Sequence, residues 1–217
     1  RQSTYSALMP IKNCLFIVLL IVSCQSVVKP SKQVLYDQDI ASDTNHLNGF
    51  KAVEVFQDVA DRSVWVSPER QCVQYLITDS TAYAGQRSMQ LKWNKITGGC
   101  QWIGLGFGWN NWMAKDFSDI YTIASIQMAV KSCSGTFKNL PVAFAFEDYA
   151  GTQNYYGFQA SMAPNGFSDS AWTIIKIPLL KFNLGDGKFE LENVKQFMIQ
   201  LEAEGGIYLD DIRIVKN

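Results

Sequence analysis

One stretch decides the fold: Pro141-Val-Ala-Phe-Ala-Phe-Glu-Asp148, in which large apolar residues alternate with small or polar ones. Successive side chains of a β-strand point to opposite faces, so this period of two predicts a strand with one buried face. The residues on the buried face are Val142, Phe144 and Phe146. The residues on the other face are Ala143, Ala145 and Glu147. The stretch therefore predicts a half-buried strand that needs a core on one side.

The same period recurs from residue 53 to residue 215, with turn residues such as Gly and Asn between the runs. We expect strands at Val53–Asp58, Gln71–Asp79, Ser88–Asn94, Gln101–Gly108, Ile123–Ser132, Pro141–Asp148, Asn154–Met162, Ala171–Leu179, Val194–Ala203 and Ile207–Val215. No stretch carries a convincing period of 3.6 residues, so long helices are not expected. Many short strands at this spacing predict an all-β fold, a two-sheet antiparallel β-sandwich of the jelly-roll type, over residues 51–217.

The composition narrows the classes of function. A chain of 217 residues with 47% hydrophobic residues can bury the core of one domain, with an N-terminal extension to spare. The formal net charge is -1, which argues against a nucleic-acid partner and against a patch for anionic membranes. The only histidine is His46, so histidine-based metal clusters and Ser-His-Asp catalysis are not expected.

The N-terminus has the pattern of a secretion signal. An apolar run, Cys14–Ser23, follows Lys12 and is shorter than the roughly 20 residues that a transmembrane helix needs. The run ends in Ile21-Val22-Ser23-Cys24, which resembles the lipobox of bacterial lipoproteins. We therefore expect a signal peptide over residues 1–23, with its true start at Met9, and a lipid on Cys24. The alternatives are an ordinary cleaved signal or a buried helix.

Residues 24–50 are expected to join the lipid anchor to the sandwich. Gln25 follows the anchor residue and is not Asp, which favours the outer membrane of a bacterial cell envelope and leaves the membrane face open. Export permits disulfides, but Cys72, Cys100 and Cys133 leave one cysteine unpaired, and their spacing does not choose the pair.

The faces that turn away from the core suggest a binding groove. They combine small residues, neutral amides, a few carboxylates and large aromatics, which suits pyranose rings, because aromatics stack on their C–H faces and amides pair with their hydroxyls. The candidate ligand-binding residues are Trp102, Gln127, Glu147, Tyr155 and Gln159. The expected floor is Gly104, Ala129, Ala143, Ala145 and Gly157, with Trp109 and Trp112 as a wall. Alternatively, the small residues only let another element pack there.

Four motifs, in this order, carry a family resemblance: Ala82–Leu91, Trp102–Phe107 with Asp116–Asp119, Ala171–Phe182 and Gly206–Ile214. They resemble family 11 carbohydrate-binding modules and the wider galactose-binding-like jelly rolls. The resemblance implies binding of β-glucan-type glycans on the concave sheet and a structural Ca2+. The metal ligands would be Asp210, which shares a strand face with Ile212 and Ile214, together with Asp211 and Asp58. The alternative is a carboxylate that caps a strand end through backbone N–H groups.

Three classes of function remain. We expect a non-catalytic lipoprotein that binds a neutral β-linked polysaccharide, with glycanases or a glycan importer as partners and with membrane contact through the lipid only. A second class is a structural or assembly module of an envelope complex. A third is a glycan-active enzyme. A hydrolase would use Glu147 with Glu202 or Asp148 as its carboxylate pair, and a lyase would use Tyr155 with Lys131.

Overall fold

The computed structural model of the chain describes Leu47, Phe50 and residues 53–58, 64–67, 69, 71–109 and 111–217. All of these belong to one unit, Asp39–Asn217. The predicted signal peptide, the predicted lipidation at Cys24 and most of the predicted linker lie outside the described residues. Within the part that is described, no helix is long and apolar enough to cross a membrane.

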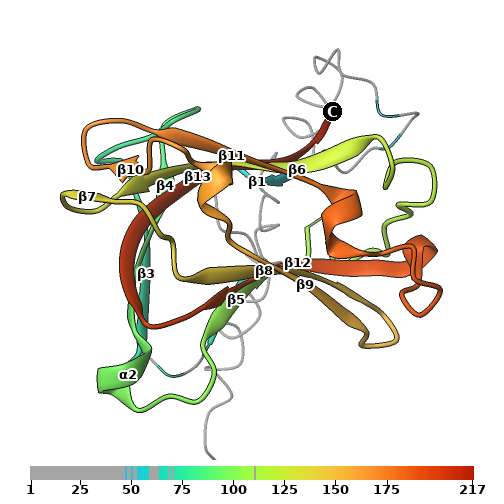
Figure 1. Cartoon of the computed structure of the whole chain (residues 1–217), viewed down its shortest axis with the longest axis horizontal. Coiled ribbons are helices and arrows are strands. Elements are labelled where there is room, and N and C mark those ends of the chain that lie inside the picture. Colours follow the sequence, from blue (N-terminus) through green and yellow to red (C-terminus); the bar gives the residue numbers. More distant parts are fainter. Residues whose placement is uncertain are drawn as a thin grey trace, which may run out of the picture. The chain divides into compact units, whose positions relative to one another are not determined.

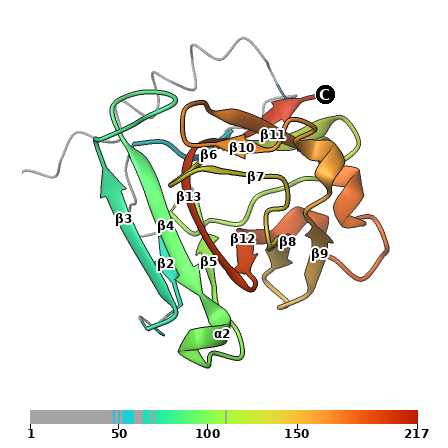
Figure 2. The same cartoon turned by 60° about the vertical axis from the view of Figure 1, so that its left-hand side comes forward.

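Two antiparallel sheets face each other across the core (Figure 1 and Figure 2). The strands of the first sheet, in spatial order, are β11 (Thr173–Pro178), β6 (Ala124–Ser132), β13 (Glu204–Lys216), β4 (Ser88–Asn94) and β3 (Val73–Thr78). A sixth strand, β1 (Glu54–Phe56), also pairs with β13. The strands of the five-stranded sheet are β2 (Val64–Val66), β5 (Gly104–Phe107), β12 (Val194–Leu201), β8 (Val142–Asp148) and β9 (Gln153–Gly157). The predicted two-sheet sandwich is confirmed.

Short elements complete the described part of the chain. Two of them, β7 (Thr136–Phe137) and β10 (Phe167–Ser168), form a separate two-stranded ladder. The others are one turn of α-helix and three of 3-10 helix: α2 (Lys95–Gly98), η1 (Ala160–Met162), η2 (Leu179–Phe182) and η3 (Leu191–Asn193). The predicted strand over Asn154–Met162 therefore ends at Gly157 and passes into η1, and β2, β7 and β10 were not predicted.

The alternating apolar residues meet between the two sheets. Val142, Phe144 and Phe146 of β8 are buried there, as the period of two predicts. Phe146 and Phe197 of the neighbouring β12 approach to 5.2 Å between ring centroids. Because aromatic pairs add about 0.5–1.5 kcal/mol each to the burial of their surface, this core holds the five-stranded sheet rigid from within.

One disulfide ties the sheets together on the side of α2. Cys72, just before β3, is bonded to Cys100, just before β5, and Cys133 is free. The sequence left this pairing open. Because Trp102 lies two residues after Cys100, the bond also restrains the segment that carries this tryptophan.

Candidate functional site

Three indole rings lie over glycines in β5 and directly after it, on the outer face of the five-stranded sheet. Ideal Cβ atoms built on Gly104, Gly106 and Gly108 would meet the rings of Trp102, Trp65 and Trp112, respectively. The glycines alternate along the chain, so their Cα atoms are about 6.6 Å apart. The rings of Trp65 and Trp102 are stacked, with 5.8 Å between centroids and 28° between planes. We call these three tryptophans the tryptophan platform.

The strand register extends this surface across the sheet. Trp65 pairs with Gly106 and Gly106 with Met198; Met198 in turn pairs with Ala145, and Ala145 with Tyr155. Four steps between strands separate the outermost aromatics by about 19 Å. Trp102 is 37% exposed and Tyr155 is 43% exposed, so both rings are open to a ligand. The surface is therefore bounded by aromatic side chains at both edge strands.

Glu147 holds the middle of this face in one arrangement. Its Oε2 accepts hydrogen bonds from Gln196 Nε2 at 2.8 Å and from Gln153 Nε2 at 3.0 Å. Its Oε1 accepts from Lys195 Nζ at 2.6 Å. An ionised carboxylate only accepts hydrogen bonds, so both amides must turn their NH2 groups toward it.

The amide oxygens therefore point outward along the sheet, each to an aromatic donor. Gln196 Oε1 accepts from Trp65 Nε1 at 2.6 Å, and Gln153 Oε1 accepts from the Tyr155 hydroxyl at 2.7 Å. A third amide, Gln200, accepts from Trp102 Nε1 at 3.2 Å. A continuous chain of hydrogen bonds thus links Trp65 on one edge strand to Tyr155 on the other, through Glu147.

The electrostatics keep this chain in one protonation state. Burial raises the pKa of Glu147, but the hydrogen bonds from Lys195, Gln196 and Gln153 lower it more, so the net pKa lies below the ordinary value. Burial, followed by the charge of Glu147, raises the pKa of Tyr155. At neutral pH Glu147 is therefore a charged acceptor and Tyr155 a neutral donor.

Three of the predicted ligand-binding residues come together on this face: Trp102, Glu147 and Tyr155. Gln159 lies just past β9, is exposed, and continues the alternation of Tyr155 and Gly157. Gln127 does not join them, because β6 belongs to the six-stranded sheet, between β11 and β13. The same holds for Ala129 of the predicted floor. Alternation gives the face of a strand but not the sheet that it joins.

The structure places the two tryptophans of the predicted wall apart. Trp112 covers Gly108 as a member of the platform, whereas Trp109 is 3% exposed and packs in the core against Phe117, at 6.2 Å between ring centroids. The amine of Lys115 lies 4.6 Å above the Trp109 ring. Trp109 therefore cannot line a groove.

Sequence reasoning missed Trp65, Gln196 and Gln200. Trp65 lies in a strand of only three residues, and its flanking Val64 and Val66 were the sole signal. Gln196 is polar but only 3% exposed. Its burial is tolerated because its amide accepts a hydrogen bond from Trp65 and donates one to Glu147. A buried amide of this kind fixes neighbouring side chains in place.

The carboxylates of the proposed catalytic pairs are engaged in other contacts. Hydrogen bonds hold the pKa of Glu147 and, through Lys95 first, that of Glu202 below their ordinary values, whereas a general acid needs a raised pKa. Asp148 is buried and accepts hydrogen bonds from the backbone N–H groups of Thr152 and Glu190. The lyase pair fails because Lys131 lies on β6, in the other sheet from Tyr155.

The carboxylates predicted to bind calcium hold the β3–β4 loop. Asp210 Oδ2 accepts from the backbone N–H groups of Tyr83 and Ala84, at 2.7 and 3.1 Å. Asp58 Oδ1 accepts from those of Gln86 and Arg87, both at 2.7 Å. The sequence analysis gave two alternatives for these carboxylates, a metal site and capping of backbone N–H groups. These four bonds are of the capping kind.

The local geometry explains this part of the family motif. Gly85 has a φ of 63°, and a Cβ there would overlap the carboxylate of Asp58, so only glycine fits. The sequence predicted that Asp210 shares the strand face of Ile212, but it does not. A β-bulge lies between Asp210 and Arg213, and Asp210 pairs with Ala129. Asp211 accepts from Arg213 at 2.7 Å.

In this arrangement Asp210 and Asp58 cap backbone N–H groups of the loop, and Asp211 pairs with Arg213. Among the described residues, no group of three or more His, Cys, Asp or Glu side chains is placed to hold a metal ion. The calcium site stays a prediction, which chelation can test.

Comparison with known proteins agrees with this geometry. A family model described as "Carbohydrate binding domain 30" matches residues 52–216. The match covers all of the described strands from β1 to β13. Among curated proteins, no relative matches the sequence.

Solved structures share the fold at low sequence identity. The family 30 carbohydrate-binding module of the cellulosomal cellulase Cel9D-Cel44B of Clostridium thermocellum is 13% identical, with a TM-score of 0.62 over 76% of this chain and 97% of that one. The family 11 module of the cellulase Lic26A-Cel5E of the same organism is 16% identical, with a TM-score of 0.51 over 78% and 95%. An exo-beta-agarase is 12% identical, with a TM-score of 0.52 over 76% of this chain and 24% of that chain. At these identities the likeness concerns the fold.

Proposed function

Since the chain belongs to the carbohydrate binding domain 30 family, we propose that it binds a neutral β-linked polysaccharide along the outer face of the five-stranded sheet, without catalysing a reaction on it. The observation that carries the proposal is the tryptophan platform. Its rings are held over glycines by packing and by hydrogen bonds to Gln196 and Gln200.

The chemistry of the face favours a neutral glycan. Its two carboxylates, Glu147 and Glu202, are each paired with a lysine, at 2.6 Å in both cases. Their charges are therefore cancelled locally, which gives no net attraction for an acidic or a basic chain. Flat rings and fixed amides remain as the groups that can recognise a ligand, by stacking on sugar C–H faces and pairing with hydroxyls.

The expected affinity is modest. The face is open, and sugar hydroxyls and amides must both lose water before they pair, which offsets much of the gain. Preorganisation reduces the cost, because the Glu147 chain already fixes the aromatic edges before a ligand arrives. A long polymer would occupy the whole width of the sheet.

Affinity electrophoresis against β-glucans, xylans and mannans tests the proposal. We expect at least one of these polymers to retard the wild-type protein, whereas a dextran gel, with α-linked chains, serves as the control. If none of the β-linked polymers retards the protein, the proposed function is wrong.

For the N-terminal region we propose a bacterial lipoprotein of the outer membrane, anchored through Cys24. The proposal rests on the lipobox-like run before Cys24 and on Gln25 after it. In cells of a Gram-negative host, the wild type should partition into detergent and Cys24→Ala into the soluble fraction. Retention of the variant in the membrane would refute the anchor and leave the glycan site unaffected.

A further inference from the structure

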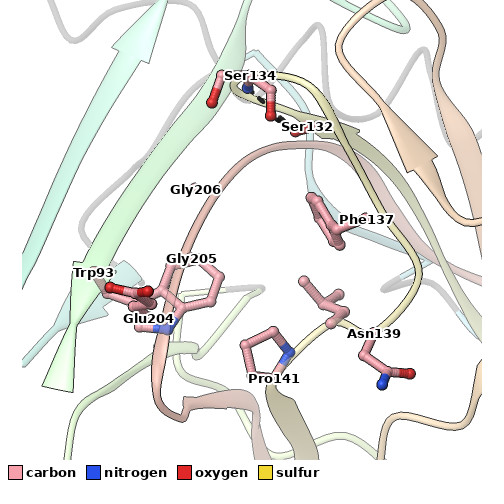
Figure 3. A pocket seen from close by; sticks show the side chains of 10 residues that line it. Trp93, Ser132, Ser134, Phe137, Asn139, Pro141, Glu204, Gly205 and Gly206 are labelled. Atoms are coloured by element: carbon pink, nitrogen blue, oxygen red, sulfur yellow. Dashed lines mark hydrogen bonds between the residues drawn. The ribbon is translucent and has the colours of Figure 1, made fainter. Parts of the chain in front are cut away.

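A pocket of about 270 Å³ opens where β6 parts from β13 (Figure 3). β13 stays paired with β4 back to Glu204, which lies opposite Asn94, but its register with β6 ends at Ile207 and Ser132, and one further backbone bond joins Cys133 N–H to the Gly206 carbonyl at 3.0 Å. Beyond Ser132 the chain turns away into β7. Glu204 and Gly205 therefore have a strand partner in β4 on one side, and the pocket lies on the other.

Ten residues line the pocket: Trp93, Ser132, Ser134, Phe137, Asn139, Leu140, Pro141, Glu204, Gly205 and Gly206. They come from β4, β6, β13 and the segment between β6 and β8, and none of them belongs to the tryptophan platform. Figure 3 shows Phe137, Asn139 and Pro141 facing Glu204 and Trp93 across the hollow. The pocket is thus a separate place from the outer face of the five-stranded sheet.

Two consecutive glycines of β13, Gly205 and Gly206, line this pocket. Glycine in a strand costs about 0.5–1 kcal/mol relative to alanine, so each needs a reason. For Gly205 the reason is Trp93, because a Cβ would lie 2.5 Å from its Cη2. For Gly206 a Cβ would lie 3.3 Å from Cys133 Cβ, a tight contact that a small shift of this side chain would relieve, and 3.8 Å from Lys92 Cγ. Glycine in a strand often marks close approach of a ligand, and Gly206 fits that reading.

The lining offers flat apolar surface and a few polar groups. Trp93 and Phe137 supply aromatic surface, and Leu140 and Pro141 supply aliphatic surface. Glu204 accepts one hydrogen bond, from Asn94 Nδ2 at 2.9 Å, and a carboxylate has about four acceptor sites. Exposed Asn139 can both donate and accept. One carboxylate disfavours an anionic ligand and is too few for a metal ion.

We propose that this pocket binds one pyranose unit of a neutral glycan, as a second sugar site of the molecule. The ligand class rests on the proposed function, while the site stands on its own residues. The volume lies just below the roughly 300–1,000 Å³ of pockets for drug-sized ligands, which suits one ring rather than a chain. The ring would pack on Phe137 or Trp93, with its hydroxyls paired to Glu204 and Asn139.

Indole N–H signals in a 1H–15N NMR titration separate the two sites. Trp93 Nε1 donates to the Glu202 carbonyl at 2.8 Å and reports the pocket. Trp65 and Trp102 donate to amides of the outer face and report the platform. We would titrate the protein with glucose, xylose, mannose and galactose singly, and then with a β-1,4-linked glucose tetrasaccharide.

At least one monosaccharide should shift the Trp93 signal saturably, in the wild type and in Trp102→Ala alike. Asn139→Ala and Glu204→Ala should each lower the affinity measured from the Trp93 signal about tenfold, which is the effect of one lost polar contact. Lys138→Ala, at an exposed neighbour that does not line the pocket, should leave it unchanged.

Failure of the two proposals would look different. If the Trp93 signal stays still for all of these sugars, or still shifts fully in both pocket variants, the pocket site is refuted. If the tetrasaccharide leaves Trp65 and Trp102 unmoved while Trp93 responds, the platform fails and the pocket stands.

Discussion

Gly106→Ala tests whether the glycines of β5 position the platform. The added Cβ would overlap the Trp65 indole and lie 2.5 Å from Gln196 Oε1. Both groups must retreat by about 1 Å to restore van der Waals contact, which breaks their 2.6 Å hydrogen bond. The lost bond costs about 1 kcal/mol, and the disturbed stacking of Trp65 on Trp102 costs about as much again.

Alanine also lowers the conformational entropy of the unfolded chain, which stabilises the folded protein by about 0.5–1 kcal/mol. We therefore expect a net loss of about 1 kcal/mol in the free energy of unfolding, read from urea titrations. Glycan affinity should fall about tenfold by isothermal titration calorimetry, because one aromatic contact of about 1.4 kcal/mol is misplaced.

Gly157→Ala is the matched control for this change. Gly157 lies on the same face, on β9, and a Cβ there would meet nothing within 4 Å. This variant should bind glycan like the wild type and be as stable or slightly more so. If Gly106→Ala behaves like Gly157→Ala in both assays, the glycine does not position Trp65 and our reasoning on the platform is wrong.

Three further predictions concern the rest of the molecule. Burial lowers the pKa of Lys115 to about 8. The unfolded chain then binds more protons than the folded one between about pH 8 and 10.4, so the free energy of unfolding should rise with pH there, by up to about 3 kcal/mol. Urea titrations of Lys115→Met should lack that rise, and an equal rise in both proteins would contradict it. Cys72→Ser with Cys100→Ser opens a loop of sequence separation 28 and should lower the free energy of unfolding by about 3–4 kcal/mol in urea titrations, where no change would show that the bond is absent in solution. Because the carboxylate of Asp210 already accepts backbone N–H groups, we expect equal melting temperatures in chelator and in excess calcium; a higher value in calcium would support the metal site.

Much of the fold follows from alternation, and the site follows only in part. The runs around Phe144 and Phe197 place their own faces correctly, because the two-sided geometry of a strand is local. The partner strands are not local. Gln127 has the same alternation as Glu147, yet its strand pairs with β13, and nothing in its residues reports that choice.

The remaining differences have similar causes. Trp109 and Trp112 occupy one short loop, and which ring enters the core depends on the loop backbone, where Trp112 has a φ of 61°. The bulge at Asp210 reverses a face that strict alternation assigns to the core side. Trp65 was not predicted as a site residue, because a strand of three residues is too short to show a period. Its contacts with Gly106 and Gln196 nevertheless make it central to the face.

The most direct test of the account is the glycan binding of Trp102→Ala beside Trp172→Ala. Trp102 is exposed on the platform, whereas Trp172 contacts Tyr83 and Tyr208 and is outside the five-stranded sheet. In affinity electrophoresis with a polymer that retards the wild type, Trp102→Ala should lose most of the retardation and Trp172→Ala should keep it, with both variants folded by circular dichroism. Full retardation of a folded Trp102→Ala, or its loss in Trp172→Ala alone, would contradict the assignment of the binding face.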